Sequence, residues 1–488
     1  MTDIVTTDDS ADFVKDITKM SVDFDRWYTD VVRKAELADY TPVRGSMVIR
    51  PYGYALWENI QRAFDDMIKA SGHENWYFPL LIPEELLRKE AEHVEGFSPQ
   101  VAWVTEAGSS KLEQRLAIRP TSETIIGTLI RRYIQSHRDL PKLTNQWCNV
   151  MRWEMRTRLF LRTAEFLWQE GHTFHATAEE AQEETDRILY YYRDLAQDWL
   201  AMPVLTGMKS RSETFPGAVH TKSIEALMRD GLALQAGTSH YFGQNFSRAY
   251  DISFSNQRNE RELCYSTSWG ISTRLIGGLI MAHGDDTGLI LPPRIAPIQV
   301  AVVPIFRDAE SREIVEAFIE TWQRAVQTRG IRLRVDWSLD RPGEKFNLWE
   351  LKGVPLRLDV GPRDVEAQQV MLVDRLTRER RPVPSAALAE QLPVELKRFQ
   401  RDLYQRAVDF REENTVEVST LAELVAHFKE KNGIVWAPWC ESEECEARVA
   451  EETGGVHTRN FDPDAYVEGS CLACGRPARR WVAFARAY

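Results

Sequence analysis

Hydrophobic residues recur at the spacing of one helix face early in the chain. Over residues 54–70 the apolar positions three to four residues apart are Leu56, Ile60, Phe64, Met67 and Ile68. This spacing predicts an amphipathic helix, because residues three and four apart share one face of an α-helix. Ser71 and Gly72 end that helix, and the apolar, aromatic run 76–81 predicts a strand closed by prolines.

Shorter apolar runs continue up to residue 200. They predict a strand over 115–119, a helix over 124–134, and strands over 146–153 and 165–169. A basic loop separates the last two strands, so we expect them to pair antiparallel. Thr177 and Glu180 form a capping-box pattern, which opens a long helix that we expect to end near Trp199.

The pattern changes near residue 298. Residues 300–306 form a nearly continuous apolar run, which suits a strand buried on both faces. Four elements are predicted after it: a helix over 309–328, an alternating strand over 331–337, and strands over 356–360 and 370–373. Alternating strands and helices indicate a small α/β unit with crossover connections. A charged helix is expected after about Pro393.

These changes divide the chain into three predicted units of an α/β (α+β) protein. Residues 1–290 form a mixed, largely antiparallel unit, and Pro292, Pro293 and Pro297 mark its end. Residues 297–395 form the α/β unit. Residues 396–488 form a small α/β unit that contains four cysteines.

Composition agrees with a large folded protein. The chain has 488 residues, of which 43% are hydrophobic and 27% charged, so two or three packed domains are expected and wholesale disorder is excluded. No apolar run approaches the ~20 residues of a membrane span. Residues 1–10 are acidic and polar, without the character of a signal or transit peptide. We therefore expect a cytoplasmic protein with no membrane partner.

The net charge of −12 argues against indiscriminate binding of nucleic acid. Locally basic stretches over 152–162 and 378–381 are nonetheless candidates for contact with a polyanion. The alternative is that these arginines form solvated faces or salt-bridged loops.

The six cysteines fall into two groups. Cys148 and Cys264 lie in apolar, strand-like runs, and we interpret them as buried packing residues. The other four form two close pairs near the end of the chain, Cys440 with Cys445 and Cys471 with Cys474. This spacing is typical of a tetrahedral four-thiolate Zn²⁺ site with a structural role. A disulfide pair is the alternative.

The sharpest local feature is Arg152-Trp153-Glu154, followed by a basic loop and by Arg162 and Phe166. A guanidinium can hold a phosphate and a carboxylate together, and an aromatic ring can stack on a base. Alone, this pattern is better explained by an ordinary salt-bridged strand edge. Its position before a second motif, in which Arg274 opens an apolar helix containing Gly277 and Gly278, favours a nucleotide site. No G-x-G-x-x-G or P-loop pattern is present.

In this order, the motifs resemble those of class II aminoacyl-tRNA synthetases, whose catalytic domain is an antiparallel sheet flanked by helices. Four further strings resemble prolyl-tRNA synthetases of the archaeal/eukaryotic type: Arg119-Pro120-Thr121-Ser122-Glu123, Trp168-Gln169-Glu170-Gly171-His172, Gln235-Ala236-Gly237-Thr238-Ser239-His240 and Ser268-Trp269-Gly270-Ile271-Ser272. The resemblance extends from about Phe24 to Tyr488.

The resemblance implies which residues bind L-proline. Thr121 and Glu123 would hold the secondary ammonium, and Phe215 would contact the ring. The full set implied for proline is Thr121, Glu123, Arg152, Trp168, Glu170, His172, Phe215, His240 and Ser268. For His172 and Trp168, packing in the core is the alternative.

The resemblance also implies a site for ATP and its Mg²⁺. Arg152 would bridge the substrate carboxylate and the α-phosphate, and Arg274 would bind the γ-phosphate; these two are the candidate catalytic residues. The full ATP set is Arg152, Glu154, Arg162, Thr163, Phe166, Gln235, Thr238, Ser272 and Arg274. No general base is required, because the proline carboxylate is already a nucleophile.

The second unit resembles the anticodon-binding domain of the prolyl, threonyl, histidyl and glycyl enzymes, on the strings Arg341-Pro342-Gly343-Glu344-Lys345-Phe346 and Glu350-Leu351-Lys352-Gly353-Val354-Pro355. That likeness implies tRNA(Pro) as a partner and recognition of unstacked anticodon bases. The candidate residues are Glu344, Lys345, Phe346 and Arg357. Salt bridges between domains are the alternative for these side chains.

The family also sets expectations for assembly and fidelity. The helix over 54–70 and the strand after it would form a homodimer interface. Residues 171–272 leave no room for an extra editing domain, so alanine and cysteine should be activated as errors. Two alternatives remain: a threonyl or seryl relative, and a catalytically silent paralogue that acts as a binding subunit.

Overall fold

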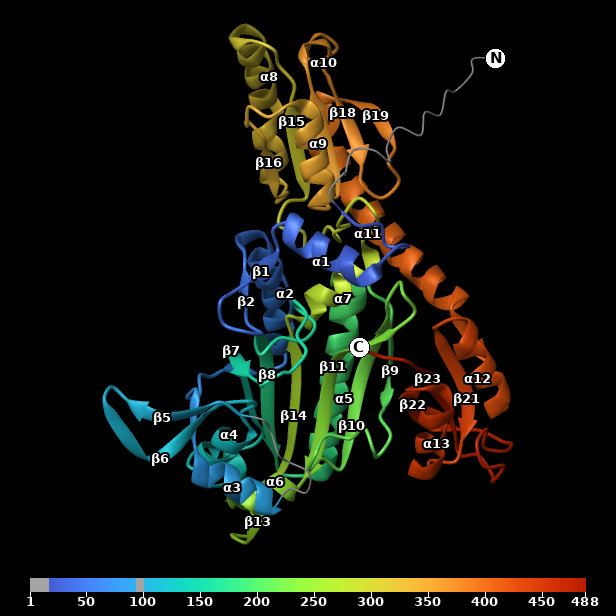
Figure 1. Cartoon of the computed structure of the whole chain (residues 1–488). Helices are drawn as coiled ribbons and strands as arrows, with labels where there is room; N and C mark the ends of the chain where they lie inside the picture. Colours follow the sequence, from blue (N-terminus) through green and yellow to red (C-terminus); the bar gives the residue numbers. More distant parts are fainter. Residues whose placement is uncertain (1–16, 94–100) are drawn as a thin grey trace.

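The computed structural model describes residues 17–93 and 101–488, and its elements form a central body, an α/β body at one end and a C-terminal body at one side (Figure 1). The long helix α11 runs from the α/β body down to the C-terminal body. Within residues 17–93 and 101–488, no helix is both long enough and apolar enough to cross a bilayer.

One sheet of eleven strands crosses two of these bodies. Its central strands β9 to β7 pair antiparallel, whereas β3 joins β7 and β20 joins β21 in parallel. In spatial order the strands are β20 (Thr415–Glu417), β21 (Ile434–Trp439), β23 (Arg480–Ala485), β22 (His457–Tyr466), β9 (Val204–Met208), β10 (His220–Leu227), β11 (Ala233–Gly243), β14 (Tyr265–Ser272), β8 (Glu165–His175), β7 (Lys142–Met151) and β3 (Glu74–Asn75).

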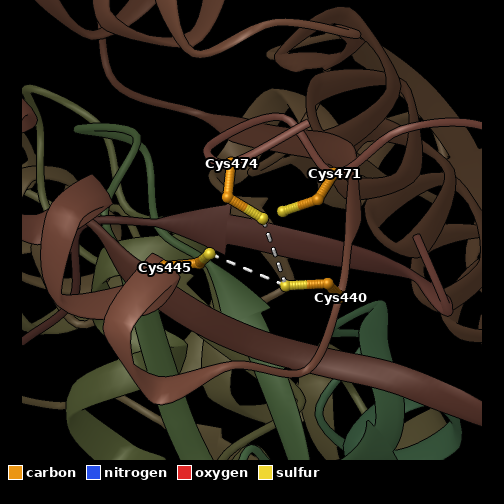
Figure 2. A group of neighbouring side chains, drawn as sticks. All are labelled: Cys440, Cys445, Cys471 and Cys474. Carbon is orange, nitrogen blue, oxygen red and sulfur yellow. Dashed lines mark hydrogen bonds between the residues drawn. The ribbon is translucent and has the colours of Figure 1, made fainter. Parts of the chain in front are cut away.

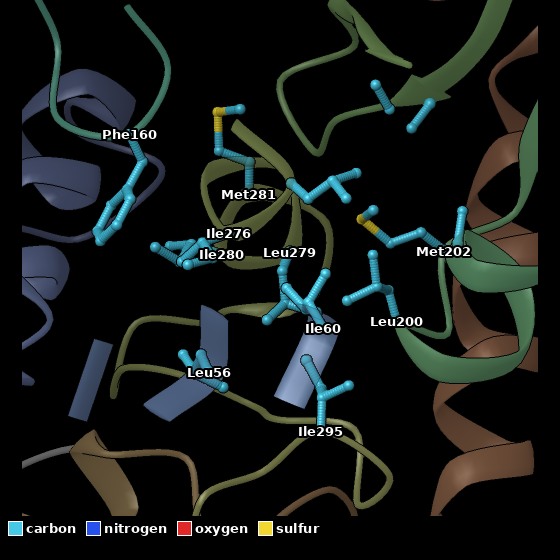
Figure 3. Packing of buried hydrophobic residues seen from close by; sticks show 14 of the residues in the cluster. Leu56, Ile60, Phe160, Leu200, Met202, Ile276, Leu279, Ile280, Met281 and Ile295 are labelled. Atoms are coloured by element: carbon cyan, nitrogen blue, oxygen red, sulfur yellow. The ribbon is translucent and has the colours of Figure 1, made fainter. Parts of the chain in front are cut away.

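Helices cover one face of this sheet and share one hydrophobic core with it. They are α1 (Phe24–Lys34), α2 (Pro51–Ala70), α5 (Ala178–Asp194) with its π-helical end Leu195–Trp199, and α7 (Arg274–His283). Figure 3 shows Leu56 and Ile60 of α2 beside Ile276, Leu279 and Ile280 of α7 in this core. Burial of these side chains, each worth about 1.5–3 kcal/mol, fixes α7 and α2 against the sheet.

Smaller elements flank the sheet. A hairpin of β1 (Ala38–Tyr40) and β2 (Met47–Ile49) precedes α2. A separate lobe contains β4 (Leu81–Pro83), α3 (Glu84–His93), β5 (Trp103–Ala107), β6 (Ser110–Ile118), α4 (Glu123–Ile130), the 3₁₀ turn His137–Asp139, α6 (Asn245–Tyr250), β12 (Ser253–Ser255) and β13 (Arg261–Leu263).

The α/β body is built on a five-stranded sheet in which three parallel strands lead into two antiparallel ones. Its spatial order is β16 (Leu333–Val335), β15 (Val300–Pro304), β17 (Leu356–Val360), β18 (Gln369–Asp374) and β19 (Arg380–Pro384). Its helices are α8 (Ala309–Thr328), α9 (Pro342–Leu351) and α10 (Pro362–Glu366), and the 3₁₀ turn Ser385–Ala387 leads into α11 (Leu388–Glu413).

Ion pairs join the α/β body to the central body. Arg375 after β18 contacts both carboxylate oxygens of Asp285 at 2.7 and 2.9 Å, and Arg378 contacts Asp285 and Glu350 at 3.3 and 2.6 Å. Arg380 pairs with Asp359. The basic stretch 378–381 is therefore salt-bridged within the chain, which is the alternative that the sequence left open.

The C-terminal body adds α12 (Leu421–Glu430) and α13 (Glu443–Thr453) to strands β20 to β23. Its strand β22 pairs with β9 of the central body through Phe461 and Met208. The sheet of the central body therefore continues directly into the C-terminal body.

Most predicted elements are confirmed, with shifts of a few residues. The helix over 309–328 and the strand over 356–360 match α8 and β17. Strands 146–153 and 165–169 correspond to β7 and β8, which pair antiparallel as expected.

Two predictions were wrong. Residues 76–80 are extended but form no strand, because the amide of Phe78 donates to the Gln146 side chain and its carbonyl accepts from the Arg119 guanidinium. The charged helix begins at Leu388, before Pro393 rather than after it, because Leu388, Leu392 and Leu396 pack into the core of the α/β body.

Candidate active site and cysteine cluster

A cavity of about 530 Å³ lies on the face of the central sheet opposite the helices, over β8, β11 and β14. Side chains of a strand alternate between the two faces of its sheet. Trp168, Glu170 and His172 of β8 consequently face the cavity, whereas Trp269 and Ile271 of β14 belong to the core. Each of the four strings that resemble prolyl-tRNA synthetases in the central body contributes residues to this cavity.

Thr121 and Glu123 lie at the buried end of the cavity. The Thr121 hydroxyl donates to the Glu123 carboxylate, which also accepts from Ser268 Oγ at 3.2 Å. Glu123 begins α4 and Thr121 lies two residues before it, so the start of the helix fixes their backbone. The arrangement presents a buried carboxylate and a hydroxyl to any cation in the cavity.

Glu170 and His172 form a second polar pair. Glu170 accepts from His172 Nε2 at 3.1 Å, from Gln146 Nε2 at 2.7 Å and from the Ser122 hydroxyl. Burial would raise the pKa of Glu170, but these hydrogen bonds outweigh it and hold the pKa below its usual value. Burial would lower the pKa of His172, yet the contact with Glu170 and the charge of Glu123 raise it. The pair therefore favours a carboxylate beside an imidazolium.

His240 has the opposite character. Burial, aided by the positive charges of His172 and Lys209, lowers the pKa of His240 to about 3, so this ring is neutral. Its Nδ1 lies 2.9 Å from Thr221 Oγ1, and its ring centroid is 4.7 Å from that of Phe215. Phe215 and His240 together give this part of the cavity an apolar, aromatic wall.

Arg152 lines the cavity, and neighbouring groups of the protein hold its guanidinium in place. Its Nε donates to the Pro120 carbonyl at 2.9 Å, and its guanidinium carbon lies 5.4 and 5.5 Å from the ring centroids of Phe166 and Trp168. The aromatic rings and the carbonyl restrict the guanidinium, which leaves its terminal nitrogens directed to the cavity. This geometry suits a group that binds an anion.

Arg274 lines the cavity from the start of α7. Its Nε donates to the Leu161 carbonyl at 3.1 Å, and its amide donates to Ser272 Oγ at 3.2 Å. Burial lowers the pKa of Arg274, and the neighbouring positive charges of Arg152 and Arg162 lower it further. An anion placed between Arg152 and Arg274 would relieve this repulsion between cations.

Three of the predicted ATP residues do not line the cavity. Glu154 and Arg162 form an ion pair at 2.7 Å in the loop between β7 and β8, and the Thr163 hydroxyl donates to the Glu165 carbonyl. Phe166, Gln235, Thr238 and Ser272 do line it. Arg158 in the same loop pairs with Asp25, so salt bridges account for much of the basic stretch 152–162.

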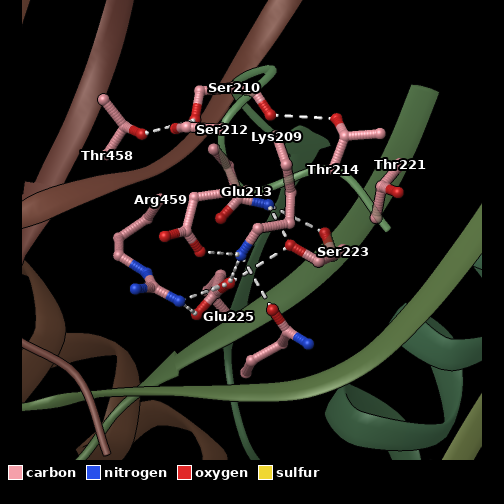
Figure 4. A network of polar contacts seen from close by, with 12 residues as sticks. Lys209, Ser210, Ser212, Glu213, Thr214, Thr221, Ser223, Glu225, Thr458 and Arg459 are labelled. Atoms are coloured by element: carbon pink, nitrogen blue, oxygen red, sulfur yellow. Dashed lines mark hydrogen bonds and ion pairs between the residues drawn. The ribbon is translucent and has the colours of Figure 1, made fainter. Parts of the chain in front are cut away.

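Sequence reasoning missed part of the cavity wall. Lys209, Ser212, Glu213, Thr214, Pro216 and Thr221 all line it. Lys209 is buried, and its Nζ donates to Gln235 Oε1 at 2.8 Å and pairs with Glu225 and Glu213 at 3.5 and 3.3 Å (Figure 4). Thr214-Phe215-Pro216-Gly217 was the only nearby signal, and it indicates a loop rather than a charged network.

The candidate residues of the α/β body lie on or near α9 and β17. The exposed Glu344 caps α9 by accepting from the Arg341 amide at 3.0 Å. Lys345 is buried and donates to the Asp336 carbonyl at 3.0 Å. The Arg357 guanidinium lies 4.1 Å from the Phe346 ring centroid and pairs with Asp359 at 2.8 Å. Phe346 and Arg357 thus form a stacked pair that remains partly exposed.

The four C-terminal cysteines converge, as predicted (Figure 2). Their sulfur atoms lie within 4.8 Å of one another, with Cys440 at 3.6 Å from Cys445 and 3.7 Å from Cys474. A tetrahedron of thiolates with Zn–S bonds of about 2.3 Å has sulfur atoms about 3.8 Å apart. A disulfide requires about 2.05 Å, so the spacing fits a metal ion rather than disulfides.

The two remaining cysteines differ from each other. Cys264 is buried in a hydrophobic cluster, as predicted. Cys148 is only half-buried, and its sulfur accepts from Trp168 Nε1 at 3.2 Å and contacts Glu170 at 3.5 Å. The interpretation of Cys148 as a buried packing residue was wrong, because β7 places it, only half-buried, beside Trp168 and Glu170.

Family models match three parts of the chain. They are the class II tRNA synthetase core domain of the G, H, P, S and T enzymes over residues 103–283, the anticodon-binding domain over 299–395, and the prolyl-tRNA synthetase C-terminal domain over 421–488. The core model alone includes threonyl and seryl enzymes; the C-terminal model distinguishes the prolyl enzymes.

Curated relatives match over almost the whole length. A Proline–tRNA ligase of Symbiobacterium thermophilum is 53% identical over 485 residues, covering 98% of this chain and 99% of the relative. One of Rubrobacter xylanophilus is 54% identical over 476 residues, covering 97% and 99%. Proline–tRNA ligase 2 of Bacillus cereus is 50% identical over 477 residues, also covering 97% and 99%.

A solved structure agrees with these relatives. Prolyl-tRNA synthetase from Cryptosporidium parvum, complexed with halofuginone and AMPPNP, superposes with a TM-score of 0.92 at 40% identity and covers 96% of this chain and 99% of that one. The eukaryotic structure confirms the predicted architecture, and the bacterial relatives, matched over 99% of their length, share it. The chain belongs to the prolyl-tRNA synthetases, a family of class II aminoacyl-tRNA synthetases.

Proposed function

We propose that the cavity binds L-proline and ATP side by side and joins them in the reaction of this family, with proline at the end formed by Thr121, Glu123 and His240. The observation that supports this most directly is that one cavity receives residues from all four strings of the central body that resemble prolyl-tRNA synthetases, together with Arg152 and Arg274. ATP would lie toward Arg152 and Arg274, where two guanidinium groups face the same space.

The proline subsite follows from charge and shape. The secondary ammonium of proline would donate to the Thr121–Glu123 pair, and the ring would lie against Phe215 and the neutral ring of His240. Glu170, His172, Trp168 and Ser268 would complete the subsite. A protonated His172 would compensate the negative charge of Glu170. Glu123 would then be the carboxylate that binds the ammonium of proline.

The ATP subsite needs positive charge and an aromatic surface. Arg152 would bridge the proline carboxylate and the α-phosphate, Arg274 would bind the γ-phosphate, and Phe166 would stack on adenine. Gln235, Thr238 and Ser272 would contact ATP and its Mg²⁺. Glu154 and Thr163, beside the cavity in the loop between β7 and β8, would read adenine, and Arg162, paired with Glu154, would complete the ATP set.

The reaction between proline and ATP then requires alignment of the two substrates rather than a general base. A carboxylate oxygen of proline attacks the α-phosphorus, the bond between the α- and β-phosphates breaks, and pyrophosphate leaves. Arg152 neutralises the charge that grows on the phosphorus oxygens. The terminal ribose hydroxyl of the tRNA next attacks the acyl carbon and releases AMP.

Arg152→Ala is the variant that tests this assignment. Loss of one preorganised cation at the transition state should lower proline-dependent ATP–pyrophosphate exchange by at least about 100-fold. Arg156→Ala, an exposed arginine of the same loop outside the cavity lining, should keep near-normal exchange. Near-normal exchange in a folded Arg152→Ala protein would refute the assignment.

The substrate range follows from the pocket and from what surrounds it. The strands and helices within residues 171–272 all belong to the central body and its lobe. A small apolar pocket discriminates weakly against smaller side chains. Exchange assayed across the standard amino acids should therefore respond strongly to proline and weakly to alanine and cysteine.

The α/β body would bind the anticodon of tRNA(Pro). Phe346 and Arg357 offer a stacking surface and hydrogen-bond donors to an unstacked base, and Glu344 at the exposed start of α9 offers an acceptor. Lys345, whose ammonium is engaged by the Asp336 carbonyl, would act by holding α9 in place.

The remaining assignments concern structure. Cys440, Cys445, Cys471 and Cys474 would hold a structural Zn²⁺, since four thiolates leave no position for a substrate. The division at 1–290, 297–395 and 396–488 remains our proposal for the domains, with α11 shared between the last two.

A homodimer would form through the β1–β2 hairpin and α2. Tyr40, Val43, Val48 and Tyr54 are exposed there, whereas the predicted apolar face of α2 packs inside the chain. An exposed group of large apolar side chains suits a protein interface.

A further inference from the structure

The C-terminal body meets the central body at one wall of the cavity. Strand β22 pairs with β9 at Phe461 and Met208. The next residues of the chain, 209–217, form the cavity wall that includes Lys209 and Phe215. The contact between the two bodies therefore lies directly beside residues that face the substrates.

Glu446 of α13 reaches this wall from the C-terminal body. Its carboxylate accepts from Ser210 Oγ at 3.1 Å, from Ser212 Oγ at 2.6 Å and from the Thr458 hydroxyl. Thr458 Oγ1 also lies 3.0 Å from Ser210 Oγ (Figure 4). Glu446 is 4% exposed, so these are buried hydrogen bonds to an anion, which are stronger than neutral ones. These hydrogen bonds hold Ser210 and Ser212 in place at the start of residues 209–217.

Arg459 makes a second connection. Its Nη2 lies 3.1 and 3.2 Å from the two oxygens of Glu225 on β10. Glu225 also faces Lys209 Nζ, and Lys209 donates to Gln235 Oε1 at 2.8 Å. Figure 4 shows Arg459, Glu225 and Lys209 in one row. A side chain of the C-terminal body is thus connected through two buried charges to a residue that lines the cavity.

We propose that Glu446 and Arg459 are positioning residues of the active site: Glu446 sets the place of wall segment 209–217, and Arg459 sets the side chain of Gln235 through Glu225 and Lys209. The proposal rests on the proposed function for the identity of the two ligands. It gives the C-terminal body a part in substrate binding beyond stability.

The polar character of this contact supports positioning. Apolar residues of similar size would join the two bodies at least as well, because buried ion pairs gain little net stability after desolvation. Hydrogen bonds of fixed direction instead determine where Ser212 and Lys209 lie. A displacement of about 1 Å in such a wall can cost a large factor in rate or binding.

Glu446→Gln tests the first part, with Glu452→Gln as its matched control on the exposed side of the same helix. We expect KM for proline in pyrophosphate exchange to rise about tenfold, with kcat and KM for ATP changed less than about threefold. Glu452→Gln should behave as the wild type. Unchanged KM values together with a lower Tm would mean that Glu446 serves stability alone, and would overturn the proposal.

Arg459→Gln tests the second part, and Arg479→Gln, an exposed arginine of the same body, is its control. KM for ATP should rise about tenfold, more than KM for proline, because Lys209 shifts toward the unpaired Glu225 and leaves Gln235. Arg459→Lys keeps the charge and should restore part of the loss. If Arg459→Gln does not fold, a rise in KM for ATP in Arg459→Lys decides the question, and normal KM values there would refute this part.

Hydrogen–deuterium exchange of the ligand-free protein separates this inference from the proposed function. Amides of 209–217 should exchange faster in Glu446→Gln than in Glu452→Gln, whatever the substrate is. Equal exchange in the two variants would contradict the inference even if activity changed. Absence of proline-dependent exchange in the wild type would instead contradict the proposed function and leave this measurement valid.

Discussion

His172 and His240 face the same cavity, but their pKa values are shifted in opposite directions. The carboxylates Glu170 and Glu123 raise the pKa of His172, whereas burial lowers the pKa of His240 to about 3. One ring can therefore fix the polar end of the cavity, while the other provides a neutral, aromatic surface. Neither difference is visible from the sequence, since it depends on neighbours brought together by β8 and β11.

His283 at the end of α7 makes stability depend on pH. Burial, helped by Arg406 and Arg229, lowers the pKa of His283 to about 3, and its Nε2 donates to the Leu200 carbonyl at 2.8 Å. Because the folded-state pKa lies below the unfolded value of about 6.5, the unfolded chain binds more protons between these values. Stability should be full above that range and fall as pH drops through it.

We therefore expect the free energy of unfolding to decrease from pH 7 to pH 5, with His283 contributing at most about 1.4 kcal/mol per pH unit. His283→Gln, measured by urea denaturation at several pH values, should flatten this dependence. His457→Gln, at an exposed position, is the control. An identical pH slope in wild type and His283→Gln would contradict the assignment.

Gly171 permits the close packing behind the cavity. A Cβ at this position would lie 2.1 Å from the buried ring of Trp269. Gly171→Ala should force that ring or β8 to move and destabilise the protein by about 1–3 kcal/mol. Gly361→Ala, where the nearest atom to an added Cβ is 3.6 Å away, should cost less in the same thermal denaturation assay. Equal Tm values for the two variants would show that the core accommodates the added methyl group without loss of stability, which would contradict this prediction.

At the scale of elements, helices with a clear apolar stripe were predicted well and extended segments less so. The stripe of α8, which includes Val315, Phe318 and Trp322, specifies both its face and its length. Residues 76–80 resemble a strand in composition, but side chains of Gln146 and Arg119 take the hydrogen bonds of a neighbouring strand. Such side-chain partners lie 40 to 70 residues away and leave no local pattern.

The four clustered cysteines come from segments that the sequence separates. Cys440 follows β21, Cys445 lies in the first turn of α13, and Cys471 and Cys474 lie in the turn before β23. We expect one zinc ion per chain in native mass spectrometry, and its loss in Cys471→Ser with a lower Tm. Cys264→Ser, outside the cluster, should keep the metal. A wild-type chain without zinc would contradict the assignment.

At the scale of the whole molecule, motifs in sequence order predicted residues that line one cavity, but not the contacts that support its wall. Thr121, Arg152, His240 and Arg274 lie in strings that identify the family, and the fold brings them to one cavity. The contact between Arg459 and Glu225 joins residues 234 positions apart. In the sequence, two charged residues so far apart cannot be distinguished from other surface charges. The pairing of β22 with β9 brings them together.

Measurement of the molecular mass in solution tests the proposed dimer. Sedimentation equilibrium should give twice the mass of one chain. Val48→Asp on β2, where the side chain is 47% exposed, should shift the protein toward the monomer, because a charge enters an apolar interface. Val394→Asp, exposed on α11 away from the hairpin, should remain dimeric. A monomeric wild type, or a dimeric Val48→Asp protein, would exclude this interface.

The pairing of β9 with β22 also has a consequence for biosynthesis. The ribosome makes β9 early, but about 250 further residues must be added before β22 exists, which takes on the order of 10 to 50 seconds. Until then β9 is an open edge, able to pair with other nascent chains. A transcript truncated before residue 457 would leave that edge open permanently, so incomplete products should be substrates for chaperones and proteases rather than shorter enzymes.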